Sequence, residues 1–135
     1  MDLYEKLKVG TFREERFMVE DIHTAYHIGS GDEKVLGTPW MISFMERVAN
    51  RLVSEYLPEG TMSVGTQLDV RHLAPTPVNL RVRIRVEVME VNPNRLLFRV
   101  EAWDPIEKIG EGQHRRAIVE KERFMKRVLM KSGSK

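Results

Sequence analysis

Three residues near the middle of the chain, Thr38, Glu46 and His72, are of types that can carry acyl-transfer or hydrolytic chemistry. A glutamate can act as a general base or as a nucleophile, and a histidine can move a proton or hold a carbonyl oxygen. Each residue also has a plain structural explanation. A threonine can cap a helix, a glutamate can pair with an arginine, and a histidine on a core face can simply be hydrogen-bonded. The elements that position them must therefore be considered next.

A long amphipathic helix is predicted to begin at Thr38 and to run to about Tyr56. Threonine is a favoured N-cap, and Pro39 suits the first helical position because its missing N–H has no partner there. Glu46 falls at the margin of the apolar face, with Asn50 one turn later, where Asn50 could orient Glu46 or contact a ligand. The predicted apolar face consists of Ile42, Met45, Ala49, Leu52, Val53 and Tyr56.

Outside this helix the apolar residues alternate, which predicts antiparallel strands. The expected strands cover residues 16–26, 64–74, 80–88, 96–102 and 110–124. Asn92-Pro93-Asn94 is typical of a hairpin turn. The second strand carries His72 on its apolar side and Gly65 where the backbone could approach a ligand closely. One helix can be wrapped by one face of such a sheet, so we expect an α+β domain with the helix as its core.

The composition indicates one globular domain. The 135 residues are 41% hydrophobic and 31% charged, and we expect a domain over residues 1–130 with a disordered tail over 131–135. The absence of cysteine excludes disulfides and thiol catalysis. No stretch approaches the roughly 20 apolar residues of a membrane span, and the N-terminus has no secretory h-region. We therefore expect a cytoplasmic protein without a membrane partner.

The charged residues do not predict a nucleic-acid partner, because the net charge is only +2 and no aromatic residues alternate with the basic ones. Alternate arginines in residues 81–85 are typical of a solvated strand face that protects a sheet edge, or they could attract coenzyme phosphates. His114-Arg115-Arg116 is either surface charge or an anchor for an anionic ligand. His23 and His27 lack a third ligand, so no metal site is expected.

Longer segments around these residues resemble the hotdog-fold acyl-CoA thioesterases, in the branch related to fluoroacetyl-CoA thioesterase. The resemblance covers about Val19 to Phe124 and implies a hotdog fold, an antiparallel sheet wrapped around one long central helix. The matching segments are Gly29-Ser30-Gly31-Asp32, Val35-Leu36-Gly37-Thr38-Pro39, Met45-Glu46, Ser63-Val64-Gly65-Thr66, Val70-Arg71-His72-Leu73-Ala74-Pro75-Thr76-Pro77 and Gly110-Glu111-Gly112-Gln113-His114-Arg115-Arg116.

The resemblance implies a thioesterase that hydrolyses an acyl-CoA to a carboxylic acid and free CoA. It implies that Thr38, Glu46 and His72 form the catalytic set, with Gly65 near the thioester and Arg116 near the acyl-CoA. It also implies a homodimer joined edge to edge between sheets, with acyl-CoA bound at the interface; a dimer of dimers is the larger alternative. No cofactor is expected, since CoA is part of the substrate.

The chain departs from the fluoroacetyl-specific pattern just before Thr38, where Asp32, Glu33 and Lys34 stand in place of a Phe-bearing lid. We therefore expect a short- or medium-chain acyl-CoA. Two other functions use the same residues: a non-enzymatic acyl-CoA-binding or ligand-sensing module, and a hydratase or dehydratase that leaves the thioester intact. Whether Glu46 acts as base or nucleophile stays open.

Overall fold

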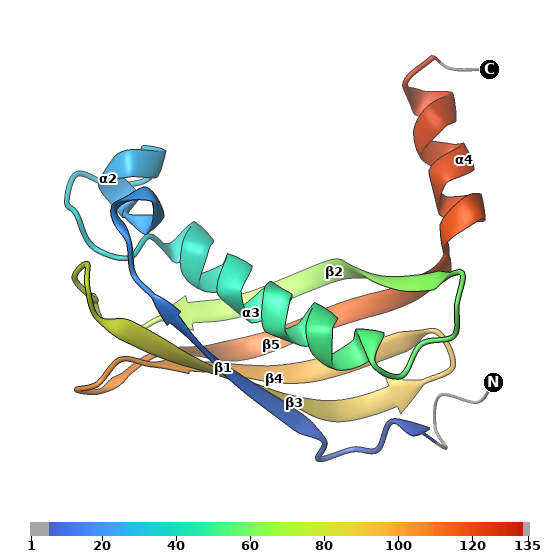
Figure 1. The fold of residues 1–135 in the computed structure, drawn as a ribbon, viewed down its shortest axis with the longest axis horizontal. Coiled ribbons are helices and arrows are strands. Elements are labelled where there is room, and N and C mark those ends of the chain that lie inside the picture. Colours follow the sequence, from blue (N-terminus) through green and yellow to red (C-terminus); the bar gives the residue numbers. More distant parts are fainter. Residues whose placement is uncertain (1–5, 134–135) are drawn as a thin grey trace.

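A five-stranded antiparallel sheet wraps around one long helix, as the sequence predicted. The computed structural model describes residues 6–133. The strands lie in the order β1-β3-β4-β5-β2, and Figure 1 shows α3 lying across one face of the curved sheet. The elements are β1 (Phe12–Met18), η1 (Asp21–His23), α2 (Ala25–Ile28), α3 (Thr38–Ser54), β2 (Thr61–His72), β3 (Arg81–Asn92), β4 (Arg95–Trp103), β5 (Lys108–Glu120) and α4 (Lys121–Lys131).

The core lies between α3 and the central strands. Strand residues that alternate along β3 and β4 are buried, which confirms the predicted period of two: Val82, Ile84, Val86, Val88, Leu96, Phe98, Val100 and Ala102. The buried face of α3 consists of Met41, Phe44, Met45, Val48, Ala49, Leu52 and Val53. Ile42 and Tyr56, predicted on this face, are only half-buried. Burial of this apolar face fixes the rotation of α3 about its axis, and therefore fixes the direction in which Glu46 points.

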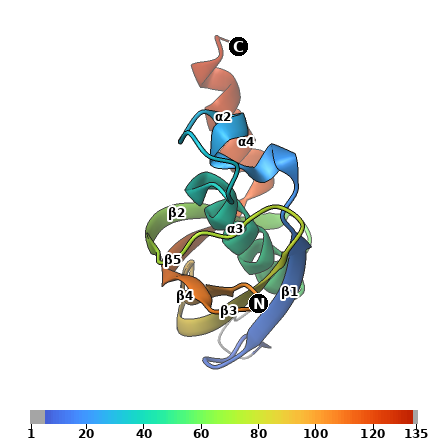
Figure 2. The same cartoon turned by 90° about the vertical axis from the view of Figure 1, so that its left-hand side faces the viewer.

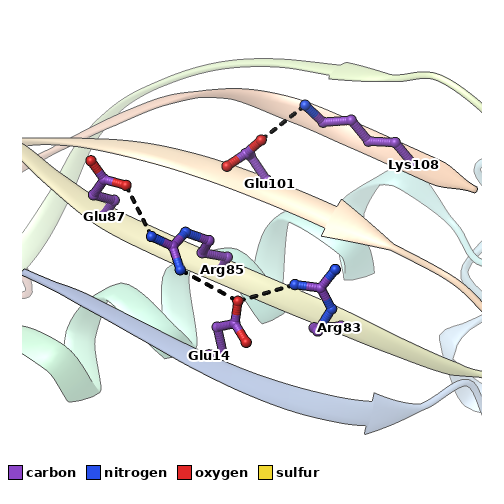
Figure 3. A network of polar contacts seen from close by, with 6 residues as sticks. All are labelled: Glu14, Arg83, Arg85, Glu87, Glu101 and Lys108. Atoms are coloured by element: carbon purple, nitrogen blue, oxygen red, sulfur yellow. Dashed lines mark hydrogen bonds and ion pairs between the residues drawn. The ribbon is translucent and has the colours of Figure 1, made fainter. Parts of the chain in front are cut away.

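The opposite face of the sheet carries paired charges (Figure 3). Glu14 of β1 accepts hydrogen bonds from Arg83 at 3.0 Å and from Arg85 at 3.5 Å, and Lys108 lies 2.9 Å from Glu101. Because β3 lies between β1 and β4, the prediction that its arginines protect a sheet edge is wrong. Two of them, Arg83 and Arg85, form ion pairs with the carboxylates of Glu14 and Glu87.

The predicted first strand over residues 16–26 is correct only up to Met18, where β1 ends, and is wrong beyond it, because two short helical turns follow. The backbone N–H of Glu20 donates to His23 Nδ1 at 2.9 Å, which is half of a reciprocal cap around η1. Thr24 Oγ1 then accepts a hydrogen bond from the backbone N–H of His27 at 3.1 Å. Such side-chain to backbone bonds compete with a strand ladder, and they override the apolar alternation here.

The edge strand β2 is irregular where the site residues lie. Its register with β5 shifts between Gly65 and Gln67. A bulge of this kind changes which side chains face the core. Thr66 and Leu68 are consequently exposed, although the alternation placed them on the apolar side, whereas Ser63 is buried and His72 is half-buried.

The chain continues past β5 as the helix α4, so the prediction that the last strand runs to Phe124 is wrong. In both Figure 1 and Figure 2, α4 stands away from the sheet on the side that carries α3. Lys131 ends α4, and residues 134–135 lie outside the described residues, so the predicted tail stays a prediction. No helix within residues 6–133 is long and apolar enough to span a membrane.

Candidate active site

Thr38 and His72 meet at the N-terminal end of α3. Thr38 Oγ1 lies 2.7 Å from His72 Nδ1. The prediction that Thr38 is the N-cap is wrong by one residue, because Gly37 is the cap and its carbonyl accepts from the N–H groups of Trp40 and Met41 at 3.0 and 3.1 Å. The Thr38 hydroxyl is therefore engaged with the imidazole and does not cap the helix.

His72 presents a second ring nitrogen that no protein group uses. Its Nε2 is buried and has no hydrogen-bond partner within the described part of the chain. Burial lowers the pKa of His72, although a backbone hydrogen bond to Ala74 opposes this effect, so the ring is neutral near pH 7. An open hollow of about 370 Å³ lies beside the pair, lined in part by Gly37 and Pro75. A ligand in this hollow would meet both Thr38 and His72.

Glu46 lies on the same helix but two turns away from Thr38. Eight residues of α-helix correspond to about 12 Å along the axis, so Thr38 pairs with His72 rather than with Glu46. Glu46 is half-buried and faces β2 at Gly65. The structure thus brings two of the three expected catalytic residues together and leaves the third at a distance within one chain.

Gly65 leaves open the space onto which three side chains converge. A Cβ atom built on Gly65 would lie 2.8 Å from Glu46 Oε2, 3.1 Å from His114 Cε1 and 3.6 Å from Arg116 Nη1. Any other residue would place its side chain against the Glu46 carboxylate. The missing Cβ therefore leaves room for a small polar group beside the carboxylate and the guanidinium.

Arg116 is held by a set of hydrogen bonds although only 6% of its surface is exposed. Its Nε donates to Ser63 Oγ at 2.8 Å, and its Nη2 donates to Ser63 O at 3.2 Å and to Asn50 Oδ1 at 3.3 Å. Burial lowers the pKa of Arg116, and the charge of Glu46 opposes this. A buried cation needs such partners to offset its desolvation. Asn50, expected to orient Glu46 or contact a ligand, here helps to hold Arg116.

His114, which the sequence left as either surface charge or ligand anchor, is completely buried. Its Nδ1 lies 2.9 Å from Gln67 O, and its Nε2 lies 3.0 Å from Arg116 Nη1. A carbonyl oxygen only accepts and a guanidinium only donates, so Nδ1 carries the proton and the ring is neutral. Burial, the largest effect, lowers the pKa of His114. Neutral His114 can therefore accept from Arg116 without repelling it.

Sequence reasoning missed Ser63 and left His114 undecided. The available signal was the strand period, because His114 and Arg116 share one face of β5 while Arg115 between them is exposed. His23 proves to pack against the rings of Trp40 and Phe44, with centroids 4.5 and 5.0 Å away. Residues 6–133 contain no group of three or more metal-ligating side chains.

Three histidines whose pKa is lowered by burial predict a stability that falls in mild acid. Burial lowers the pKa of His23, His72 and His114 below 6.5 in the folded chain, so the unfolded chain binds more protons below that pH. The free energy of unfolding should be level above about pH 7 and should decrease from about pH 6.5 towards pH 5. Urea unfolding at several pH values measures this.

The variant His114→Gln should flatten that decrease, because a glutamine amide can replace both hydrogen bonds without binding a proton. The exposed His27, changed to Gln, is the matched control and should leave the slope unchanged. A wild-type free energy that stays level down to about pH 5 would contradict the neutral state of the buried rings.

Comparison with known proteins identifies the family. Residues 8–122 match the model of the FlK family, fluoroacetyl-CoA-specific thioesterase. The fluoroacetyl-CoA thioesterase of Streptantibioticus cattleyicolor is 37% identical over 99 residues, which cover 73% of this chain and 71% of that protein. The match to the family model spans every residue of the candidate site.

Solved structures confirm the hotdog fold. A threonine-to-serine variant of the fluoroacetyl-CoA thioesterase FlK in complex with acetyl-CoA has a TM-score of 0.88 at 32% identity, covering 93% of this chain and 98% of that chain. A hot-dog-like protein from Thermanaerovibrio acidaminovorans has a TM-score of 0.91 at 30% identity, covering 100% of both chains. The chain therefore belongs to the fluoroacetyl-CoA-specific thioesterase family and is a thioester hydrolase.

Proposed function

We propose that this thioesterase hydrolyses a short- or medium-chain acyl-CoA to a carboxylic acid and free CoA, with Glu46, Thr38 and His72 as its catalytic residues. The observation that carries the proposal is the convergence of the Glu46 carboxylate and the Arg116 guanidinium on the open Cα of Gly65. The acetyl-CoA bound to a related enzyme supports the class of substrate. Family membership favours hydrolysis over the binding-module and hydratase alternatives.

The proposed reaction follows from the chemistry of these groups. Glu46 accepts a proton from water as the water oxygen attacks the thioester carbonyl. Alternatively, it attacks that carbon directly and forms a mixed anhydride, which water then hydrolyses to the carboxylic acid and free Glu46. The buried positive charge of Arg116 lies where it can stabilise negative charge that develops beside Glu46. When the C–S bond breaks, the CoA thiolate takes up a proton. His72 positions the carbonyl or supplies this proton, and Thr38 holds the imidazole.

The separation of about 12 Å between Thr38 and Glu46 leads us to place the complete site between two chains. The edge strand β2 has no charged residue over residues 61–68, whereas four of the seven residues of β1 are charged. A charge-free edge is the one open to pairing with another strand. Antiparallel pairing of two β2 strands along their whole length would place His72 of the partner subunit opposite Thr61. The partner's His72 would then lie four strand positions from Gly65, whereas His72 of the same chain lies seven positions from it.

The preference for a short or medium acyl chain rests on the segment before α3. Asp32, Glu33 and Lys34 are exposed there, close to the hollow beside Thr38 and His72. A charged segment does not provide the aromatic lid of a fluoroacetyl-specific enzyme. The cytoplasmic location and a dimer of dimers stay predictions.

The variant Glu46→Gln should reduce free-thiol release from acyl-CoA by about 100-fold or more, because the amide can neither accept the proton nor attack the carbonyl. The assay should cover acyl-CoAs from acetyl to long-chain and aryl. Glu59→Gln, in the exposed loop after α3, is the matched control and should retain wild-type activity. Wild-type rates in Glu46→Gln would remove Glu46 from the mechanism.

The variant Gly65→Ala should lower kcat/KM by about 10- to 100-fold, because its methyl group would press on the Glu46 carboxylate and displace a reacting group. Its unfolding midpoint should change little, since Gly65 is exposed at the bulge of an edge strand. Thr66→Ala, at the next and also exposed position, serves as the control. An unchanged kcat/KM in Gly65→Ala would show that the space beside Glu46 is not used.

A further inference from the structure

The C-terminal helix α4 leaves its apolar face uncovered within the chain. Met125, Val128 and Leu129 lie three and four residues apart, and 42 to 49% of each is exposed. No residue of α4 is buried, and both views show the helix standing clear of the sheet (Figures 1 and 2). A helix of 11 residues is marginal in water without tertiary packing, so a partner surface is needed to stabilise it.

A second surface of the same chain has the complementary character. We call residues 20–34, which include η1, α2 and the loop before α3, the acidic segment. It contains four acidic residues and one lysine, a net charge of −3, whereas α4 contains five basic residues and one acidic residue, a net charge of +4. The acidic segment also exposes the apolar side chains of Ile22 and Tyr26. The two surfaces therefore match in charge and in apolar area.

These surfaces cannot meet within one chain. The acidic segment is tied to the N-terminal end of α3, where Gly37 N–H donates to His23 O at 2.9 Å. The start of α4 is tied beyond the other end of α3, where Lys121 N–H donates to Gly60 O at 2.9 Å. The 17 residues of α3 span about 25 Å, and Figure 1 shows α2 and α4 at its opposite ends, on the same side of the sheet.

Pairing between two β2 strands removes this separation. Thr61 pairs with Glu120 just before α4, and His72 lies at the other end of β2, against Thr38. In an antiparallel pair, Thr61 of one chain lies opposite His72 of the partner subunit. The basic helix of one chain then stands beside the acidic segment of the other, on the face of the joined sheet that carries both α3 helices.

We propose that α4 packs on the acidic segment of a second copy of this chain and covers the hollow beside the partner's Thr38–His72 pair. Ala25 and Ser30 of the acidic segment line that hollow, so a helix seated there closes it from one side. The partner helix thereby forms a wall of the acyl-CoA site and shields it from bulk solvent. This inference rests on the proposed function, because it uses the same dimer in which two β2 strands pair.

The lack of cysteine in the chain allows a direct cross-linking test. One variant carries Leu129→Cys on α4, and a second variant of different mass carries Tyr26→Cys on the acidic segment. The two are mixed and treated with a short bis-maleimide. We expect a product that contains one chain of each kind. Phe12→Cys replaces Tyr26→Cys in the matched control, because Phe12 is similarly exposed (53% against 60%) but lies on the far edge strand β1. The control should give several-fold less product with Leu129→Cys.

Charge reversal tests the recognition itself. Lys121→Glu with Lys126→Glu in the Leu129→Cys chain should lower the cross-linked yield several-fold. Lys121 lies on the apolar face, four residues before Met125, and Lys126 borders that face, so both charges would lie at the proposed contact. Asp32→Lys with Glu33→Lys in the Tyr26→Cys chain should restore the yield. Neither Asp32 nor Glu33 makes an ion pair within residues 6–133, so this reversal breaks no contact inside the chain.

Four results would overturn the proposal: equal cross-linking to Phe12→Cys, no cross-linking in a dimeric protein, a protein that is monomeric in solution, or sedimentation with phosphatidylserine vesicles through α4 without cross-linking. Thiol release from acyl-CoA by the same variants, before cross-linking, separates the two proposals. Thiol release without the product that links positions 129 and 26 contradicts only the docking of α4 and leaves the proposed hydrolysis intact. The product without any release supports the docking and contradicts the proposed hydrolysis.

Discussion

The spacing of Thr38 and Glu46 along α3 is the constraint on which the candidate site depends. Backbone hydrogen bonds fix about 12 Å of helix between them, and no change of side-chain rotamer closes that distance. His72 is bonded to Thr38, whereas Arg116 lies with Glu46 at Gly65. Each chain therefore presents two partial sites, and a second chain is the simplest means of joining them. The proposed second chain also accounts for the absence of charge over residues 61–68 of β2 and for the uncovered face of α4.

The Arg116 network gives the Glu46 end of the site its electrostatic character. Desolvating a guanidinium is costly, and the cost is offset by oxygen acceptors from Ser63 and Asn50 together with the nearby Glu46 carboxylate. A protonated imidazole at His114 would repel Arg116, but Nε2 can accept from the guanidinium only in the neutral ring, and burial favours that form. The positive charge is thus fixed in place before any substrate arrives, which is the condition for stabilising a transition state without reorganisation.

Sequence reasoning succeeded where hydrophobic period decides the structure and failed where individual polar contacts do. The α3 stripe and the hairpin at Pro93 and Asn94 were predictable because regular burial imposes a period. The expected strand over residues 16–26 failed because His23 and Thr24 bond the local backbone.

The site itself was only partly predictable. The family resemblance indicated Thr38, Glu46, His72 and Arg116 as one set, but the pairing of Arg116 with Ser63 spans 53 residues. That pairing depends on the β2–β5 register, which a bulge of one residue shifts. No local pattern reports such a bulge, and none reports the distance that separates Glu46 from the Thr38–His72 pair.

The most direct test of a site shared between chains is the thioesterase activity of mixed dimers, formed from Glu46→Gln chains and His72→Asn chains that are each inactive alone. If Glu46 of one chain works with His72 of the partner subunit, each mixed dimer contains one site with both native residues. An equal mixture should then recover about a quarter of the wild-type activity, since about half of the dimers are mixed. If the mixture stays as inactive as either variant alone, each site is built within one chain and the shared site is contradicted.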